Sequence, residues 1–334
     1  DPLNLWVALL FGVKMEKVLL GKTGLEVSRL GIGLSEIGSS DEETSKKILN
    51  TALDNGINFF DTSSCYGKSE EFVGKNLFRH RNNIILASKC GHSSRFDSNL
   101  PDWSYQGIKE SIDRSLTLLK TDRIDIMQLH SCGVETLEKG EVIRALEEAK
   151  SNGKIVHLGF SGDNDAAIWA AKSKKFETIQ TSFNLVEQKA RYELFKLVDN
   201  NDLGLIAKRP IANGAWRANE NPNVHSAPTN YAEEYFNRAG IMNGEGSIIN
   251  EPKDRIMTSM GYTFSFNDID VGIIGTQNPK HLLIKLLPIL PKPTISISLL
   301  NNSNVSIFKA FFLKFPNLTS LSYLFMLFEI VSIM

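Results

Sequence analysis

The sequence predicts an α/β fold, a (β/α)8 or TIM barrel preceded by a β-hairpin, on the basis of two observations. Short apolar runs rich in β-branched residues alternate with longer helical patterns from Met15 to about Leu286, as in a chain of βαβ units. Eight such runs follow one another without a pattern that marks a reversal of strand order, which favours a closed barrel over an open doubly wound sheet. The 334 residues are enough for one such barrel as a single domain.

The hairpin and the barrel strands are expected in chain order. The segment KVLLGKTGLEVSRL is typical of a hairpin whose turn holds Gly21 and Gly24, because glycine tolerates tight-turn geometry. The strands expected after it are 29–33, 58–60, 84–88, 124–129, 156–160, 178–181, 203–207 and 271–274.

Helical patterns fill the gaps between these strands. Acidic residues that follow Asp41 favour a helix start, and the pair Asn55 and Gly56 predicts its end. Between residues 104 and 119 apolar side chains recur at helical spacing, and a shorter helix is expected over 142–149.

The two ends of the chain differ in composition from the barrel segment 15–286. Residues 1–14 hold a short apolar run without a basic leader or a small-residue cleavage site, so an upstream or non-native extension is expected rather than a signal peptide. Residues 287–334 are poor in charge, and their last apolar stretch is barely long enough to span a bilayer. Because Glu329 interrupts that stretch, a read-through or frame-shifted end is expected, with a tail anchor as the alternative.

Composition excludes several classes of function. With 37 basic and 38 acidic residues the formal net charge is −1, so no electrostatic footprint for nucleic acid or for an anionic membrane is present. Three cysteines without CxxC spacing argue against a disulfide framework and favour a reducing compartment, here the cytoplasm. Neither GxGxxG after the first strand nor GxxxxGK[ST] occurs, so a nicotinamide cofactor would bind without a Rossmann fingerprint.

Isolated polar residues stand at the ends of three successive strand patterns. Asp61 follows the second apolar run, and Tyr66 lies in the loop just beyond it. Lys89 follows the third run and His130 follows the fourth. Because catalytic residues of (β/α)8 barrels come from the carboxyl ends of the strands, these four side chains are expected to meet at the mouth of the barrel.

The four side chains have complementary chemistry. A phenol has a pKa of about 10, and a nearby ammonium such as Lys89 is expected to lower the pKa of Tyr66 so that it acts as a proton donor. Asp61 would hold Lys89 in its charged form, and His130 would donate a hydrogen bond to a carbonyl oxygen. Together they would protonate the alkoxide that forms as a carbonyl carbon receives hydride.

Four segments resemble the aldo-keto reductase superfamily, namely FFDTSSCYGKSEEFVGKNL, IILASKCG, DRIDIMQLHSC and GKIVHLGFSGDN. The likeness runs from about Met15 to Leu282. It implies that Asp61, Tyr66, Lys89 and His130 are the catalytic residues and that the protein reduces small aldehydes or ketones. It also implies NADPH, held extended across the barrel mouth, with NADH left open as an alternative.

The same resemblance assigns the cofactor site. Ser161 and Gln180 match the residues that bind the nicotinamide carboxamide, whereas Gly162 stands where an Asn is often found. The stretch IAKRPIANG matches the segment after the seventh strand, and its Lys208 replaces the ring that usually stacks on the nicotinamide. Lys208 and Arg209, which precede Pro210, would instead face the pyrophosphate, with a solvated basic pair as the alternative.

The segment IIGTQNPKHL resembles the loop that opens the last cofactor helix. Gly275 and Thr276 begin this loop, and Asn278 and Lys280 would meet the adenosine 2′-phosphate at the helix N-terminus. His281 stands at a position where the family often has an Arg. The motif therefore matches only in part, and NADPH is expected as the cofactor with NADH as the alternative.

Several further interpretations remain open. Cys65, Cys90 and Cys132 border the four residues and are expected to be apolar fillers, with a redox-sensitive mouth as the alternative and no metal site expected. Trp103 and Trp216 are expected to be packing residues, with a place in the lining of the substrate pocket as the alternative. Other functions on the same fold are a Schiff-base lyase that uses Lys89 as nucleophile and a non-catalytic cofactor-binding regulatory barrel.

Overall fold

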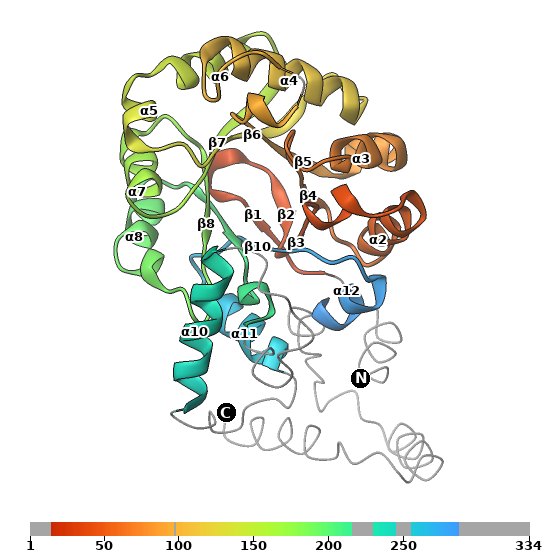
Figure 1. The fold of residues 1–334 in the computed structure, drawn as a ribbon, viewed down its shortest axis with the longest axis vertical. Helices are drawn as coiled ribbons and strands as arrows, with labels where there is room; N and C mark the ends of the chain where they lie inside the picture. The colour runs from red at the N-terminus through yellow and green to blue at the C-terminus, as the bar shows by residue number, and fades with distance from the viewer. Residues whose placement is uncertain (1–14, 97, 216–229, 245–254, 287–334) are drawn as a thin grey trace, which may run out of the picture. The chain divides into compact units, whose positions relative to one another are not determined.

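Eight parallel strands close into a barrel in the computed structural model (Figure 1). Neighbouring strands follow chain order, and the last strand pairs with both the first and the seventh. The predicted closed barrel is therefore confirmed, and the open doubly wound sheet is excluded. The strands are β3 (Leu30–Gly33), β4 (Phe59–Asp61), β5 (Ile85–Cys90), β6 (Ile124–His130), β7 (Ile155–Ser161), β8 (Thr178–Ser182), β9 (Gly204–Lys208) and β10 (Val271–Ile274).

The structure describes residues 15–96, 98–215, 230–244 and 255–286. The expectations for residues 1–14, for Trp216 and for the segment 287–334 lie outside the described residues and stay predictions. Within the described part, no helix is both long enough and apolar enough to cross a membrane.

The predicted hairpin closes the amino-terminal end of the barrel. Its strands β1 (Lys17–Leu19) and β2 (Glu26–Ser28) pair antiparallel, and Figure 1 shows them across the barrel opening. The turn between them is bound to the strand connections, because the Lys22 amide donates to the carbonyl oxygen of Asp202 at 2.8 Å. Gly21 is required there, since its φ is +46° and a Cβ would lie 2.3 Å from the Gly204 nitrogen.

Helices surround the barrel and cover the outer faces of the strands (Figure 1). A layer of apolar side chains fills the space between strands and helices. The helices described are α2 (Glu42–Asp54), α3 (Ser69–Leu77), α4 (Tyr105–Leu119), α5 (Val134–Glu138), α6 (Glu141–Ser151), α7 (Asn164–Ser173), α8 (Leu194–Asn200), α10 (Asn230–Gly244), α11 (Arg255–Phe264) and α12 (Pro279–Leu286).

The helices α2 and α4 begin where the sequence predicts. The side chain of Asp41 caps α2 by accepting the Thr44 amide proton at 2.8 Å. Ser104 caps α4 in the same way, accepting from the Gly107 amide. The apolar stripe of α4 is buried, as its helical spacing requires.

Strand alternation divides the barrel interior into an apolar layer and a polar layer. Because successive side chains of a strand point to opposite faces, residues two apart share the inward face. Near the hairpin the inward side chains are apolar and form one cluster, which includes Phe59, Ala87, Ile126 and Ile206. Two residues further along the same strands the inward positions are Asp61, Lys89, Gln128 and Lys208. The polar residues thus rest on an apolar floor at the carboxyl end of the barrel.

Candidate active site

A buried ion pair lies at the centre of the polar layer. Lys89 Nζ is 2.5 Å from Asp61 Oδ2, and it also donates to the carbonyl oxygen of Thr62 at 3.0 Å. The second carboxylate oxygen, Oδ1, accepts from the side-chain amides of Gln128 and Gln180, each at 2.9 Å. Both oxygens are therefore satisfied, which a buried carboxylate requires.

The ammonium of Lys89 stays charged in this environment. Burial alone would lower the pKa of Lys89, but the carboxylate of Asp61 and, after it, the contact with Tyr66 outweigh the effect of burial and raise the pKa. Because an ammonium has no free electron pair, Lys89 is not a nucleophile in this arrangement.

Tyr66 lies above this pair, in the loop that follows β4. Lys89 Nζ is 4.8 Å from the centroid of the Tyr66 ring. Burial raises the pKa of the phenol above its ordinary value. The ammonium of Lys89 acts to lower this pKa, but its effect is smaller than that of burial. The expected net lowering of this pKa was therefore wrong, although Lys89 acts in the expected direction. Tyr66 accordingly keeps its proton at neutral pH.

His130 ends β6 and faces Tyr66 edge-on, with ring centroids 5.8 Å apart. Burial and then the positive charge of Lys89 lower the pKa of His130 to about 2. The imidazole is therefore neutral at physiological pH and carries one proton. Its Nδ1 lies 3.5 Å from the Sγ atom of Cys65.

A second imidazole and an indole flank His130. The ring of His92, in the loop after β5, has its centroid 4.9 Å from that of His130. Trp103 donates through Nε1 to the carbonyl oxygen of His130 at 3.2 Å. Trp103 therefore lies beside His130, and its place in the lining of a substrate pocket stays a prediction.

Ser161 and Gln180 are joined to the same network. The Ser161 hydroxyl donates to Oε1 of Gln180 at 2.9 Å, and Gln180 in turn donates to Asp61. The structure thus brings the two residues expected to bind the carboxamide next to the ion pair. At Gly162 a Cβ would lie 2.6 Å from the Phe160 ring, so this ring occupies the space that an Asn side chain needs at its first carbon.

Lys208 and Arg209, at the end of β9, are held by a carboxylate that the sequence did not indicate. Asp163 Oδ2 is 3.2 Å from Lys208 Nζ and 3.8 Å from Arg209 Nη1. Burial alone would raise the pKa of Asp163, but Lys208, the Ser182 amide and Arg209 outweigh burial and lower it. Burial lowers the pKa of Lys208 despite its carboxylate partner. The alternative of a freely solvated basic pair does not hold.

Pro210 and the loop before α12 have mainly structural contacts. The carbonyl oxygen of Pro210 accepts from the hydroxyls of Ser259 and Thr263. Asn278 caps α12 by accepting the Lys280 amide proton at 3.0 Å. The side chain of Lys280 is exposed.

The rest of this loop is fixed by its own contacts. The Thr276 hydroxyl accepts from the Asn278 amide at 3.1 Å. At Gly275 a Cβ would lie 2.9 Å from Glu36, so close packing explains the glycine.

The three cysteines are free thiols. Burial raises the pKa of each one, to about 12 for Cys132, so all three keep their protons at neutral pH. Cys90 points outward from β5 into the apolar layer under the helices, and Cys132 lies in the same cluster. These two are fillers, and the redox-sensitive alternative loses its physical basis because it needs ionised thiols.

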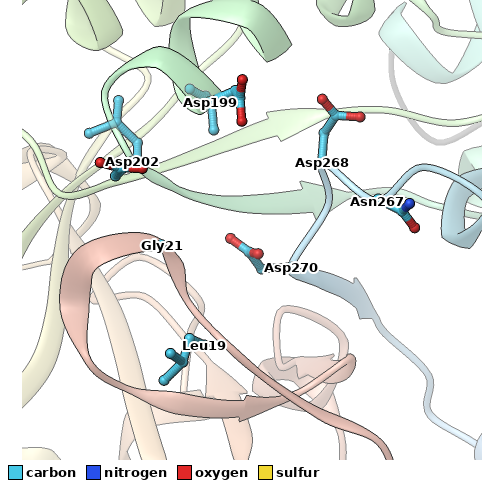
Figure 2. A pocket seen from close by; sticks show the side chains of 9 residues that line it. Leu19, Gly21, Asp199, Asp202, Asn267, Asp268 and Asp270 are labelled. Carbon is cyan, nitrogen blue, oxygen red and sulfur yellow. The ribbon is translucent and has the colours of Figure 1, made fainter.

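An acidic pocket lies at the opposite end of the barrel, beside the hairpin (Figure 2). Its volume is about 180 Å³, and Figure 2 shows the carboxylates of Asp199, Asp202, Asp268 and Asp270 around it. Within the residues that the structure describes, no group of three His, Cys, Asp or Glu side chains has an arrangement that could hold a metal ion.

Sequence reasoning missed two polar side chains of this site, Gln128 and Asp163, and one pairing of two others. Gln128 occupies the inward position two residues before His130, and this period-2 spacing was a signal that could have identified it. Asp163 and the pairing of His92 with Asp102 had no such signal, because their loops lack a regular period.

Comparisons with known proteins agree with this architecture. A model of the aldo/keto reductase family matches residues 29–263. The chain is 34% identical over 207 residues to an uncharacterised oxidoreductase of Bacillus subtilis, YqkF, and 31% identical over 230 residues to L-galactose dehydrogenase of Arabidopsis thaliana. These alignments cover 60% and 64% of this chain and 66% and 71% of the two relatives, so the likeness spans about two thirds of their length.

A solved structure has the same fold over most of its length. It is an aldo-keto reductase of Bacillus halodurans in its holo form, with 26% identity and a TM-score of 0.69 over 85% of this chain and 93% of that one. The fold and these matches define a class, the NAD(P)H-dependent oxidoreductases built on a barrel. The chain belongs to the aldo/keto reductase family.

Proposed function

We propose that this protein reduces the carbonyl group of small aldehydes or ketones to an alcohol, with Tyr66 as the proton donor and NADPH as the cofactor. The observation that carries the proposal is the assembly of buried Lys89 and Asp61 with half-buried Tyr66 and His130 at one end of the barrel. Each group has the protonation state that the reaction needs, namely a protonated phenol, an ammonium, a paired carboxylate and a neutral imidazole.

The donor set beside the assembly fits a nicotinamide dinucleotide. The hydroxyl of Ser161 and the amide of Gln180 suit a carboxamide, and Lys208 and Arg209 supply cations for phosphate groups. Lys280, exposed at the start of α12, would meet the 2′-phosphate together with the loop that holds Gly275, Thr276 and Asn278. When bound, the reduced nicotinamide supplies the hydride.

The chain's own residues would handle the proton. The Cys65 thiol keeps its proton and lies 3.5 Å from Nδ1 of His130, which favours Nε2 as the nitrogen that carries the imidazole proton. His130 would donate that hydrogen to the substrate oxygen and orient the carbonyl. Tyr66 would transfer its proton to the same oxygen as negative charge develops there.

Lys89 and Asp61 would support this transfer without touching the reacting atoms. A tyrosinate forms as the phenol loses its proton, and the ammonium of Lys89 stabilises it in a site of low dielectric. Asp61 keeps Lys89 charged and in place. The Schiff-base lyase is disfavoured because Lys89 is held as an ammonium. We place the protein in a reducing compartment, the cytoplasm, on the basis of its three free thiols.

Purified protein tests this proposal with a panel of aldehydes, ketones and quinones. The loss of NADPH absorbance should match the alcohol formed mole for mole, and NADPH should be used faster than NADH. Borohydride added with substrate should leave no adduct on Lys89. A covalent adduct, or tight NADPH binding without turnover of any carbonyl, would instead support the lyase or the regulatory barrel.

A further inference from the structure

The loop after β5 holds a second imidazole beside the proposed site. The ring of His92 lies 4.9 Å from that of His130, and the two planes are 70° apart. Its side chain is 21% exposed, so it is set in the wall of the mouth rather than in the core. The proposed proton transfer does not use His92, so its presence there calls for another role.

A carboxylate fixes the orientation of this imidazole. Nδ1 of His92 lies 3.4 Å from Oδ2 of Asp102. Asp102 also accepts from the Ser94 amide at 2.8 Å and from the Ser94 hydroxyl at 3.1 Å. These contacts outweigh burial and lower the pKa of Asp102, so it is an ionised acceptor. The contact with Asp102 places a proton on Nδ1 that points at this carboxylate, and in this tautomer Nε2 presents a lone pair.

The other side of His92 is packed against Trp103. The two ring centroids are 4.9 Å apart, and the Trp103 amide donates to the carbonyl oxygen of Gly91 at 2.7 Å. Trp103 has a φ of +52°, which non-glycine residues rarely adopt. Gly91 has a φ of +133°, and a Cβ there would lie 2.7 Å from the indole. With Gly91 and Trp103 both at positive φ, His92 lies between the indole and His130.

The two imidazoles have opposite hydrogen-bonding character. His130 is assigned as a donor through Nε2, whereas Nε2 of His92 is an acceptor. Among the described residues, Asp102 is the hydrogen-bond partner of the His92 ring, through Nδ1. A ligand that matches both rings needs an acceptor oxygen and, on a neighbouring atom, a hydroxyl that donates.

We propose that His92 recognises a hydroxyl group on the carbon next to the substrate carbonyl, so that the preferred substrates are 2-hydroxy aldehydes and 2-hydroxy ketones. This inference rests on the proposed function and specifies its substrate class. His130 binds the carbonyl oxygen, His92 accepts from the adjacent hydroxyl, and Asp102 is a positioning residue that fixes the tautomer of His92.

Matched substrates test the inference through a ratio. The readout is kcat/KM for 2-hydroxypropanal divided by kcat/KM for propanal at saturating NADPH, because effects common to both substrates cancel. A site with a built acceptor should favour the hydroxy substrate by about tenfold or more in the wild type. His92→Phe should bring the ratio close to one, and His92→Gln, which keeps an acceptor oxygen, should retain part of the preference.

Two further variants separate recognition from general damage. Asp102→Asn keeps an acceptor for Nδ1 and should retain more of the preference than Asp102→Leu. His157→Phe is the matched control, because His157 also pairs with a carboxylate, that of Glu177 at 3.3 Å. His157 lies near the start of β7 and Glu177 directly precedes β8, at the opposite end of the strands from His130, so the ratio should stay at the wild-type value.

A measurement on the wild type alone keeps the inference testable if the variants do not fold. Glycolaldehyde carries a donor hydroxyl, and methoxyacetaldehyde carries none at the same position. The wild type should prefer glycolaldehyde by about tenfold. Equal use of both, or a stronger preference for a 2-oxo acid, would overturn the inference while leaving carbonyl reduction intact. Failure to reduce any carbonyl would instead overturn the proposed function.

Discussion

Lys89 Nζ and Asp61 Oδ2 lie 2.5 Å apart, and the two side chains are only 1% and 2% exposed. A charge buried to this extent is stable only with its partner, since desolvation costs several kcal/mol for each ion. The pair therefore supports both the folded barrel and the protonation states at its mouth.

Removal of both partners should cost less stability than the two single removals added together. We expect Asp61→Leu to destabilise the fold by roughly 3–5 kcal/mol, because an ammonium stays buried without its carboxylate. Lys89→Met should cost less, because the amides of Gln128 and Gln180 still donate to Asp61. The double variant should lose less stability than the sum of the single variants, as measured by urea unfolding.

An exposed pair provides the control for this cycle. Lys172 and Glu193 lie 2.8 Å apart but are 55% and 54% exposed. Their alanine cycle should show a coupling of at most about 1 kcal/mol. Additive losses at Asp61 and Lys89 would show that the buried pair does not act as a unit.

His130 should contribute no titration to the pH profile of reduction. Its pKa of about 2 lies far below the working range, so the imidazole stays neutral from about pH 5 upward. His130→Gln should lower kcat/KM by about 10- to 100-fold, less than the full loss of an oxyanion donor, because the amide still donates. The shape of the profile should not change. A limb near neutral pH that disappears in His130→Gln would contradict the assignment.

Asp270, in the acidic pocket of Figure 2, should make stability depend on pH. Burial raises the pKa of Asp270 to about 6, although the amides of Leu205 and Gly21 donate to it. Between about pH 4 and pH 6 the folded protein holds a proton that the unfolded chain releases. Stability due to this group therefore falls as pH rises through that window and is constant above it.

Asp270→Asn removes this dependence. The variant keeps an oxygen that accepts from the Leu205 amide, whose contact with Asp270 is 2.9 Å, but carries no charge. We expect it to be more stable than the wild type at pH 7–8 by about 1–2 kcal/mol, with equal stability near pH 4. Urea unfolding at several pH values measures the difference. A variant that is less stable at pH 8 would show that the charged carboxylate is needed.

The barrel could be predicted from the sequence because its strands are buried on both faces and separated by turn residues. Most strand boundaries lie within one or two residues of the prediction. The strand β4 begins at Phe59, one residue after the predicted start at Asn58. The Asn58 side chain is hydrogen-bonded to the hairpin, where it accepts from the Ser28 amide and donates to the carbonyl oxygen of Glu26. Asp61, Lys89 and His130 could be located because they end apolar runs.

The rest of the site depends on contacts that a linear pattern does not contain. The pKa of Tyr66 is raised because the effect of burial exceeds the opposing effect of Lys89, and both depend on the folded structure. The pairing of Asp163 with Lys208 joins a loop to the end of a strand 45 residues further along the chain. The position of His92 likewise depends on its packing against Trp103. The positive φ of Trp103 could not be predicted from the sequence, because tryptophan rarely adopts it.

The most direct test of the central claim is a single-turnover comparison of wild type and Tyr66→Phe. Both proteins are loaded with NADPH and mixed with an aldehyde, and nicotinamide oxidation is followed by absorbance. We predict that Tyr66→Phe slows this step by about 100-fold or more, while the Kd for NADPH, measured by fluorescence in the same samples, changes little. A rate that stays close to that of the wild type would contradict Tyr66 as the proton donor.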